Sequence, residues 1–158
     1  MKRSMSVWLL ALFFAWAAVK SARSLAGAES VTDYALLNSV GIGVVFYVIT
    51  ALLLIGEGLT AFLLLAKRAS AYRVGRFLIV GECVNGLVIS GIAALHPDVA
   101  RSMYAASRTA RGIPGGSDSL LDFLFSPLGT GAVAVVYMTG WAVLYYLLRR
   151  VRPELERT

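Results

Sequence analysis

The chain has 158 residues, of which 58% are hydrophobic and 15% charged, and its mean hydropathy is +0.74. This composition excludes most classes of soluble globular protein and predicts an integral membrane protein. A formal net charge of +6 would suggest nucleic-acid binding in a soluble chain. Here the lysines and arginines gather at the ends of apolar runs, as they do in proteins that span a bilayer, so no nucleic-acid partner is expected.

Four apolar runs are separated by polar segments, and we predict a transmembrane helix in each. The predicted spans are residues 5–26, 40–66, 76–96 and 127–148. A helix needs about 20 residues to cross the hydrocarbon core, and the backbone must be helical because lipid offers it no hydrogen-bond partners. The predicted fold class is therefore all-α, with a single membrane domain, residues 1–158, built as a bundle of four transmembrane helices.

The first run has an alternative interpretation as a cleaved signal peptide. Its uninterrupted apolar stretch is 15 residues long, and residues 26–28 resemble an A-x-A cleavage site. Against cleavage, Lys20 and Arg23 would lie just before that site, whereas a spanning helix tolerates them if Lys20 extends to the membrane interface. We therefore expect four spans, or three if residues 1–28 are removed.

The distribution of cations predicts the orientation of the chain. With the N-terminus inside, ten lysines and arginines fall on the cytoplasmic side and five on the outer side. Cytoplasmic loops carry an excess of these residues, so both termini are expected in the cytoplasm, with residues 149–158 as a cytoplasmic tail. The expected location is the plasma or inner membrane.

The outer loop, residues 97–126, is long enough that it should contain structure of its own. Its first half alternates apolar side chains and arginines at helical spacing, which predicts a short amphipathic helix. Glycines and a proline at residues 112–116 interrupt this pattern, and a second short apolar segment follows. The candidate contacts for lipid headgroups are Arg101, Arg108 and Arg111.

Two acids lie inside predicted spans, Glu57 in the second and Glu82 in the third. An ionised carboxylate is costly in hydrocarbon, so such an acid normally faces inward, has a partner or is neutral. Because only ten residues, 67–76, separate the two apolar runs, the spans should be antiparallel neighbours whose polar faces meet. Helical spacing predicts a shared polar site with these members: Glu57, Glu82, Asn85, Tyr47, Thr50 and His96.

Two interpretations of this polar site are open. It is either a protonatable site for an ion or small solute, with His96 at its outer mouth, or a hydrogen-bonded lock that fixes helix pairing. Four glycines adjoin the two acids and are expected to remove bulk where backbones or a ligand approach closely: Gly56, Gly58, Gly81 and Gly86.

The sequence carries no catalytic or metal-binding motif, and Cys83 has no second cysteine with which to pair. We therefore expect a non-enzymatic protein without a cofactor or a metal ion. The expected function is that of an accessory or assembly protein, which associates with itself or with a membrane-protein partner. The alternative is an oligomeric proton- or cation-linked transporter or channel for a small solute that uses Glu57 and Glu82.

Overall fold

The computed structural model describes residues 4–27, 32–110, 112 and 118–156, and these residues form helices and turns without any strand. Four helices are long and apolar enough to cross a membrane. They are α1 (Met5–Ala26), α3 (Gly43–Leu65), α4 (Ser70–Leu95) and α7 (Pro127–Glu156). The predicted all-α bundle with four membrane-spanning helices is therefore confirmed.

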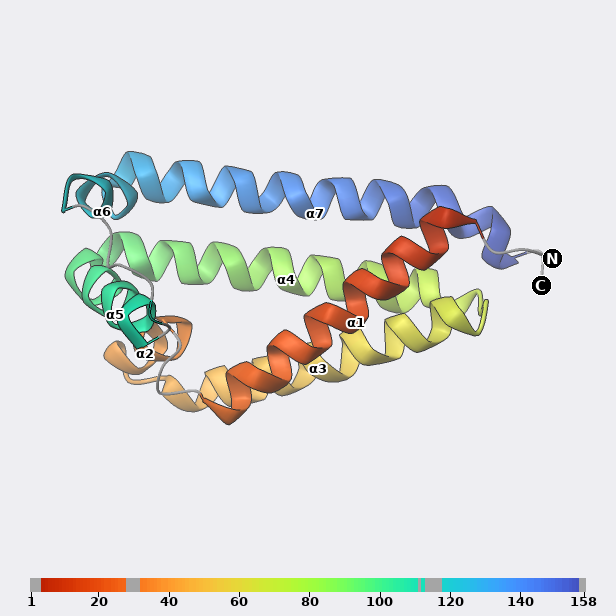
Figure 1. Ribbon diagram of the computed structural model, residues 1–158, viewed down its shortest axis with the longest axis horizontal. Coiled ribbons are helices and arrows are strands. Elements are labelled where there is room, and N and C mark those ends of the chain that lie inside the picture. The colour runs from red at the N-terminus through yellow and green to blue at the C-terminus, as the bar shows by residue number, and fades with distance from the viewer. Residues whose placement is uncertain (1–3, 28–31, 111, 113–117, 157–158) are drawn as a thin grey trace.

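The four long helices run lengthwise through the molecule (Figure 1). Helices α4 and α7 lie side by side, and α1 crosses and contacts α3. The start of α1 and the end of α7 meet at one end of the bundle, where the backbone N–H of Ser4 donates to the Glu154 carboxylate at 3.1 Å. An even number of spans returns a chain to the side from which it started, and this contact fits that requirement.

Three short helices lie at the opposite end of the bundle: α2 (Thr32–Ser39), α5 (Pro97–Ala110) and α6 (Asp118–Leu124) (Figure 1). Helix α5 is the short amphipathic helix expected in the outer loop. Helix α2 was not expected from the sequence. Its buried residues, Leu36 and Leu37, are adjacent in the chain, so no spacing of three or four residues marks it as an amphipathic helix.

Three of the long helices differ in extent from the predicted spans. Helix α4 begins at Ser70, six residues before the predicted start at residue 76, and its first turn places Ala71 in the main core. Helix α3 begins at Gly43, three residues into the apolar run, because Gly41 adopts a left-handed φ of +79° and turns the chain. Helix α7 continues to Glu156, through residues expected to form a tail. Its last turns remain helical because Val151 and Leu155 are buried in the main core.

The main apolar core lies in the half of the bundle nearest the termini, which we call the packed half. There α1, α3, α4 and α7 meet, and Phe14, Leu64 and Leu148 have no exposed surface. The outward faces of the same helices expose large apolar side chains such as Leu52 and Phe77. Such continuous apolar surface is what a bundle presents to lipid.

Candidate functional site

A cavity of about 330 Å³ lies in the other half of the bundle, which we call the cavity half. Its walls come from the second half of α1, the first half of α3, the second half of α4, the first half of α7, and α2. This volume falls within the range of small-molecule sites, which begins at about 300 Å³.

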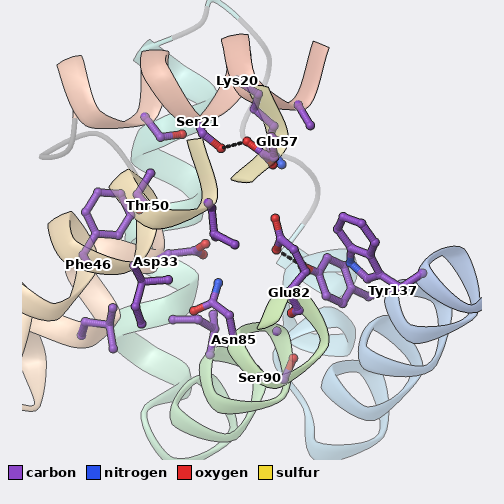
Figure 2. A pocket seen from close by; sticks show the side chains of 18 of the residues that line it. Lys20, Ser21, Asp33, Phe46, Thr50, Glu57, Glu82, Asn85, Ser90 and Tyr137 are labelled. Carbon is purple, nitrogen blue, oxygen red and sulfur yellow. Dashed lines mark hydrogen bonds between the residues drawn. The ribbon is translucent and has the colours of Figure 1, made fainter. Parts of the chain in front are cut away.

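Polar side chains from five helices line this cavity, and Figure 2 shows most of them from close by. Glu57 is 2% exposed and Glu82 is 8% exposed, so both acids are buried. The polar lining consists of Lys20, Ser21, Ser24, Asp33, Thr50, Glu57, Glu82, Asn85, Ser90 and Tyr137. The lining thus holds three acids and one lysine.

Glu57 joins α3 to α1. Its carboxylate accepts a hydrogen bond from the hydroxyl of Ser21 at 2.7 Å (Figure 2). Thr50 lies seven residues earlier on α3, or about two helical turns, and it is buried on the same face. The α3 face predicted from spacing therefore does point into the bundle at these two positions.

Glu82 joins α4 to α7 in the same manner. The hydroxyl of Tyr137 donates to the Glu82 carboxylate at 2.9 Å (Figure 2). The Tyr137 ring fits against α4 only because residue 86 is glycine, since a Cβ there would lie 2.2 Å from Cε1 of the ring. Across the cavity, the carboxyl groups of Glu57 and Glu82 interact electrostatically.

Lys20 of α1 and Asp33 of α2 bring further charges to the cavity. The Lys20 ammonium interacts electrostatically with Asp33, Glu57 and Glu82, although its side chain is largely exposed. Burial raises the pKa of Asp33 above its ordinary value, and Lys20 partly opposes that rise. With every group ionised, three acids outnumber one lysine, so the cavity attracts positive charge.

Four of the six residues predicted from helical spacing line the cavity: Thr50, Glu57, Glu82 and Asn85. Tyr47 and His96 do not. The ring of Tyr47 packs against Tyr34 and Phe46, and His96 is exposed at the end of α4.

Helix geometry explains both differences. Tyr47 lies ten residues before Glu57, which turns it about 80° away around the helix axis. His96 lies fourteen residues after Glu82, or about 21 Å along the axis, beyond the reach of the cavity. Steps of three and four residues keep side chains aligned over two turns but not over three or four.

Sequence reasoning missed six of the ten polar residues that line the cavity: Lys20, Ser21, Ser24, Asp33, Ser90 and Tyr137. Among these residues, Lys20 brings a positive charge to the buried acids. A polar residue near the end of a span, such as Ser21, is a weak signal, because contact with Glu57 depends on how α1 crosses α3.

The glycines beside the acids behave differently from one another. A Cβ on Gly56 would lie 3.0 Å from Leu78, and one on Gly86 would overlap Tyr137. Gly58 and Gly81 face open space, and a Cβ on either would meet no other part of the described chain within 4 Å.

Two of the three arginines predicted to contact lipid headgroups, Arg101 and Arg108, have partners within the chain. Arg101 forms an ion pair with Asp122 of α6, and the Arg108 guanidinium lies 5.8 Å from the centre of the Tyr104 ring. Arg111 lies outside the described residues. Contact of these arginines with lipid headgroups stays a prediction.

Among the residues that the structure describes, no group of three or more His, Cys, Asp or Glu side chains could hold a metal ion. Cys83 is a half-buried free thiol on α4. Comparison of the chain with protein-family models, curated proteins and solved structures finds no match.

Proposed function

We propose that this multi-pass membrane protein is non-enzymatic and binds a small positively charged solute in its cavity. The observation that carries the proposal is that three acids, two of them buried within spanning helices, line one cavity with a single lysine. Carboxylates attract a cation more strongly inside a protein than in water, because the surroundings screen the charges less.

Binding of this kind is also the first step of proton- or cation-linked transport. A bundle of four spans encloses little space, so transport of the bound solute would require an oligomer. The same two acids, Glu57 and Glu82, would then couple movement of the solute to movement of protons or cations.

A second candidate function is that of an accessory or assembly protein. The hydrogen bonds of Glu57 to Ser21 and of Glu82 to Tyr137 each join two spanning helices. Within the described residues, every buried side-chain nitrogen and oxygen has a partner. In this case the acids fix the pairing of the helices, and the bundle associates with itself or with a membrane-protein partner through its apolar faces.

We also propose that both termini are cytoplasmic, in a plasma or inner membrane, and that the cavity half lies toward the outer side. The excess of cations near the termini and the loop at residues 66–69 supports this orientation. An uncleaved first span fits the packing of α1, because removal of residues 1–28 would take Phe14 from the core and Ser21 from Glu57.

Binding can be measured with the full chain in lipid nanodiscs by tryptophan fluorescence, since Trp16 and Trp141 line the cavity. We expect a saturable change with small monovalent cations at constant ionic strength. Glu57→Gln and Glu82→Gln should each lower the affinity about tenfold, the effect expected from losing roughly 1.4 kcal/mol of charge interaction. Helical content and oligomer size should stay unchanged.

The matched control is Glu154→Gln, an acid that pairs with the Ser4 backbone at the far end of the bundle. This variant should bind as the wild type does. The absence of any saturable change in the wild type would contradict the proposal. Equal affinity in the wild type and both cavity variants would also contradict it, and would favour the assembly function instead.

A further inference from the structure

The cavity has an aromatic wall as well as an acidic one. Phe13, Trp16, Phe46, Tyr137 and Trp141 line it. The ring centres of Phe13 and Trp141 are 6.1 Å apart, and those of Tyr137 and Trp141 are 6.0 Å apart, so these three rings form one continuous surface from α1 to α7. Aromatic faces attract organic cations, tryptophan most strongly, and the attraction grows when water is excluded.

The cavity is poorly suited to a bare metal ion. Calcium and magnesium need six or more oxygen ligands at about 2.0–2.6 Å. The described part of the chain has no cluster of three or more His, Cys, Asp or Glu side chains that could hold a metal. A volume of about 330 Å³ corresponds to on the order of ten water molecules, which is much more space than one ion fills.

Lys20 indicates which cation chemistry the cavity accepts. Its side chain is an alkylammonium, and it interacts with all three acids of the lining. The side chain is largely exposed, and a lysine stem is flexible, so the ammonium can withdraw without moving α1. A free ammonium compound that enters the cavity would meet the same carboxylates.

We infer that the cavity takes a small organic ammonium ion with a compact apolar body, and that Lys20 is its built-in competitor. The inference rests on the proposed function and deepens it by naming the class of solute. The carboxylates of Glu57, Glu82 and Asp33 supply the opposite charge, and the aromatic wall covers the apolar body. Lys20 neutralises part of the acidic lining in the empty cavity, and the incoming ammonium displaces it.

The probes are choline, its uncharged isostere in which a tertiary butyl group replaces the trimethylammonium, and potassium and magnesium ions. They are titrated at constant ionic strength into the full chain in nanodiscs. Choline should bind about tenfold more tightly than the isostere and than either inorganic ion. Trp16→Leu should weaken choline binding about fivefold, as expected for loss of one cation–π contact.

Lys20→Gln should strengthen choline binding about fivefold, because it removes a competing charge of roughly 1 kcal/mol. The matched control is Arg23→Gln, which removes a cation three residues further along α1 that does not line the cavity. It should change the affinity less than about twofold, the scale of a screened surface charge.

The outcomes separate this inference from the proposed function. Potassium or magnesium binding as tightly as choline would overturn the organic ammonium class while leaving a cation site in place. Failure of every cation to bind, or equal binding of choline and its isostere, would overturn both. Weaker choline binding in Lys20→Gln would show that the lysine supports the site, and would overturn its role as a competitor.

Discussion

The packed half and the cavity half of the bundle are built from the same four helices, yet different interactions hold them together. In the packed half, side chains such as Phe14 and Leu148 are completely buried, and Gly75 lets Leu148 approach α4 closely. In the cavity half, the helices stand around an open volume, and two interhelical hydrogen bonds, Ser21–Glu57 and Tyr137–Glu82, cross between them.

The difference shows how a small membrane protein keeps a polar cavity. In lipid there is no hydrophobic force between helices, so van der Waals packing and interhelical hydrogen bonds drive their association. In the packed half, the four helices are in close contact and hold the bundle together. The cavity half can therefore contain polar groups that are less closely packed. Loss of a buried side chain in the packed half should therefore unfold the bundle, whereas a similar loss in the cavity half should affect mainly the cavity.

The largest expected effect concerns which side of the membrane each half faces. In a Cys83→Ser background, a cysteine at Ser70, next to the packed half, should be protected from an impermeant label added outside intact cells. A cysteine at Ser107 of α5, beyond the cavity half, should react fully. The reverse pattern would place the cavity half on the cytoplasmic side and contradict the orientation inferred from the cations.

The two halves can be compared directly with one neighbouring pair of phenylalanines. Phe14→Ala should lower the free energy of unfolding by about 3 kcal/mol, because Phe14 is fully buried in the packed half. Phe13→Ala should lower it by about 1 kcal/mol, because Phe13 is half-buried and lies at the edge of the core, where it also lines the cavity. Unfolding in mixed micelles with increasing SDS measures the free energy of unfolding of both variants. Equal losses of free energy in the two variants would contradict the division into two halves.

A pair of glycines on α4 tests the join between α4 and α7. Gly86→Ala should lower the free energy of unfolding by about 2 kcal/mol, because the new methyl group overlaps the Tyr137 ring and disturbs its hydrogen bond to Glu82. Gly81→Ala, on the same helix and facing open space, should cost nothing measurable. The same SDS titration serves both variants. Equal tolerance of the two substitutions would mean that Tyr137 does not pack against α4.

The smallest expected effect is a pH dependence that comes from Asp33 of the cavity lining. Burial raises the pKa of Asp33 in the folded protein, so the folded state favours the protonated acid. The stability that the protonated Asp33 contributes should be fully present below its ordinary pKa of 3.8. It should be lost as the pH rises through the raised pKa of the folded state. The melting temperature of the wild type minus that of Asp33→Asn should therefore fall as the pH rises. A difference in melting temperature that does not change with pH would contradict this prediction.

The predicted site shows over how many residues helical spacing predicts a shared helix face. Spacing correctly placed Thr50 with Glu57 and Asn85 with Glu82. The first pair is separated by seven residues, which is close to two full helical turns, and the second by three residues, which is slightly less than one turn. Spacing failed for Tyr47 and His96, because the rotation accumulates and the helix carries distant residues away from the cavity. The partners on α1, α2 and α7 had no such signal.

The sequence by itself determined that this chain is a four-helix membrane bundle with two acids in its interior. Both conclusions follow from local properties, since bilayer thickness sets the length of an apolar run and hydrocarbon penalises every exposed charge. The tertiary structure decided that Ser21 meets Glu57, that Tyr137 meets Glu82, and that Lys20 and Asp33 share their cavity. Those contacts depend on how each helix is rotated and where it crosses its neighbours, which is a property of the packed bundle and of no single segment.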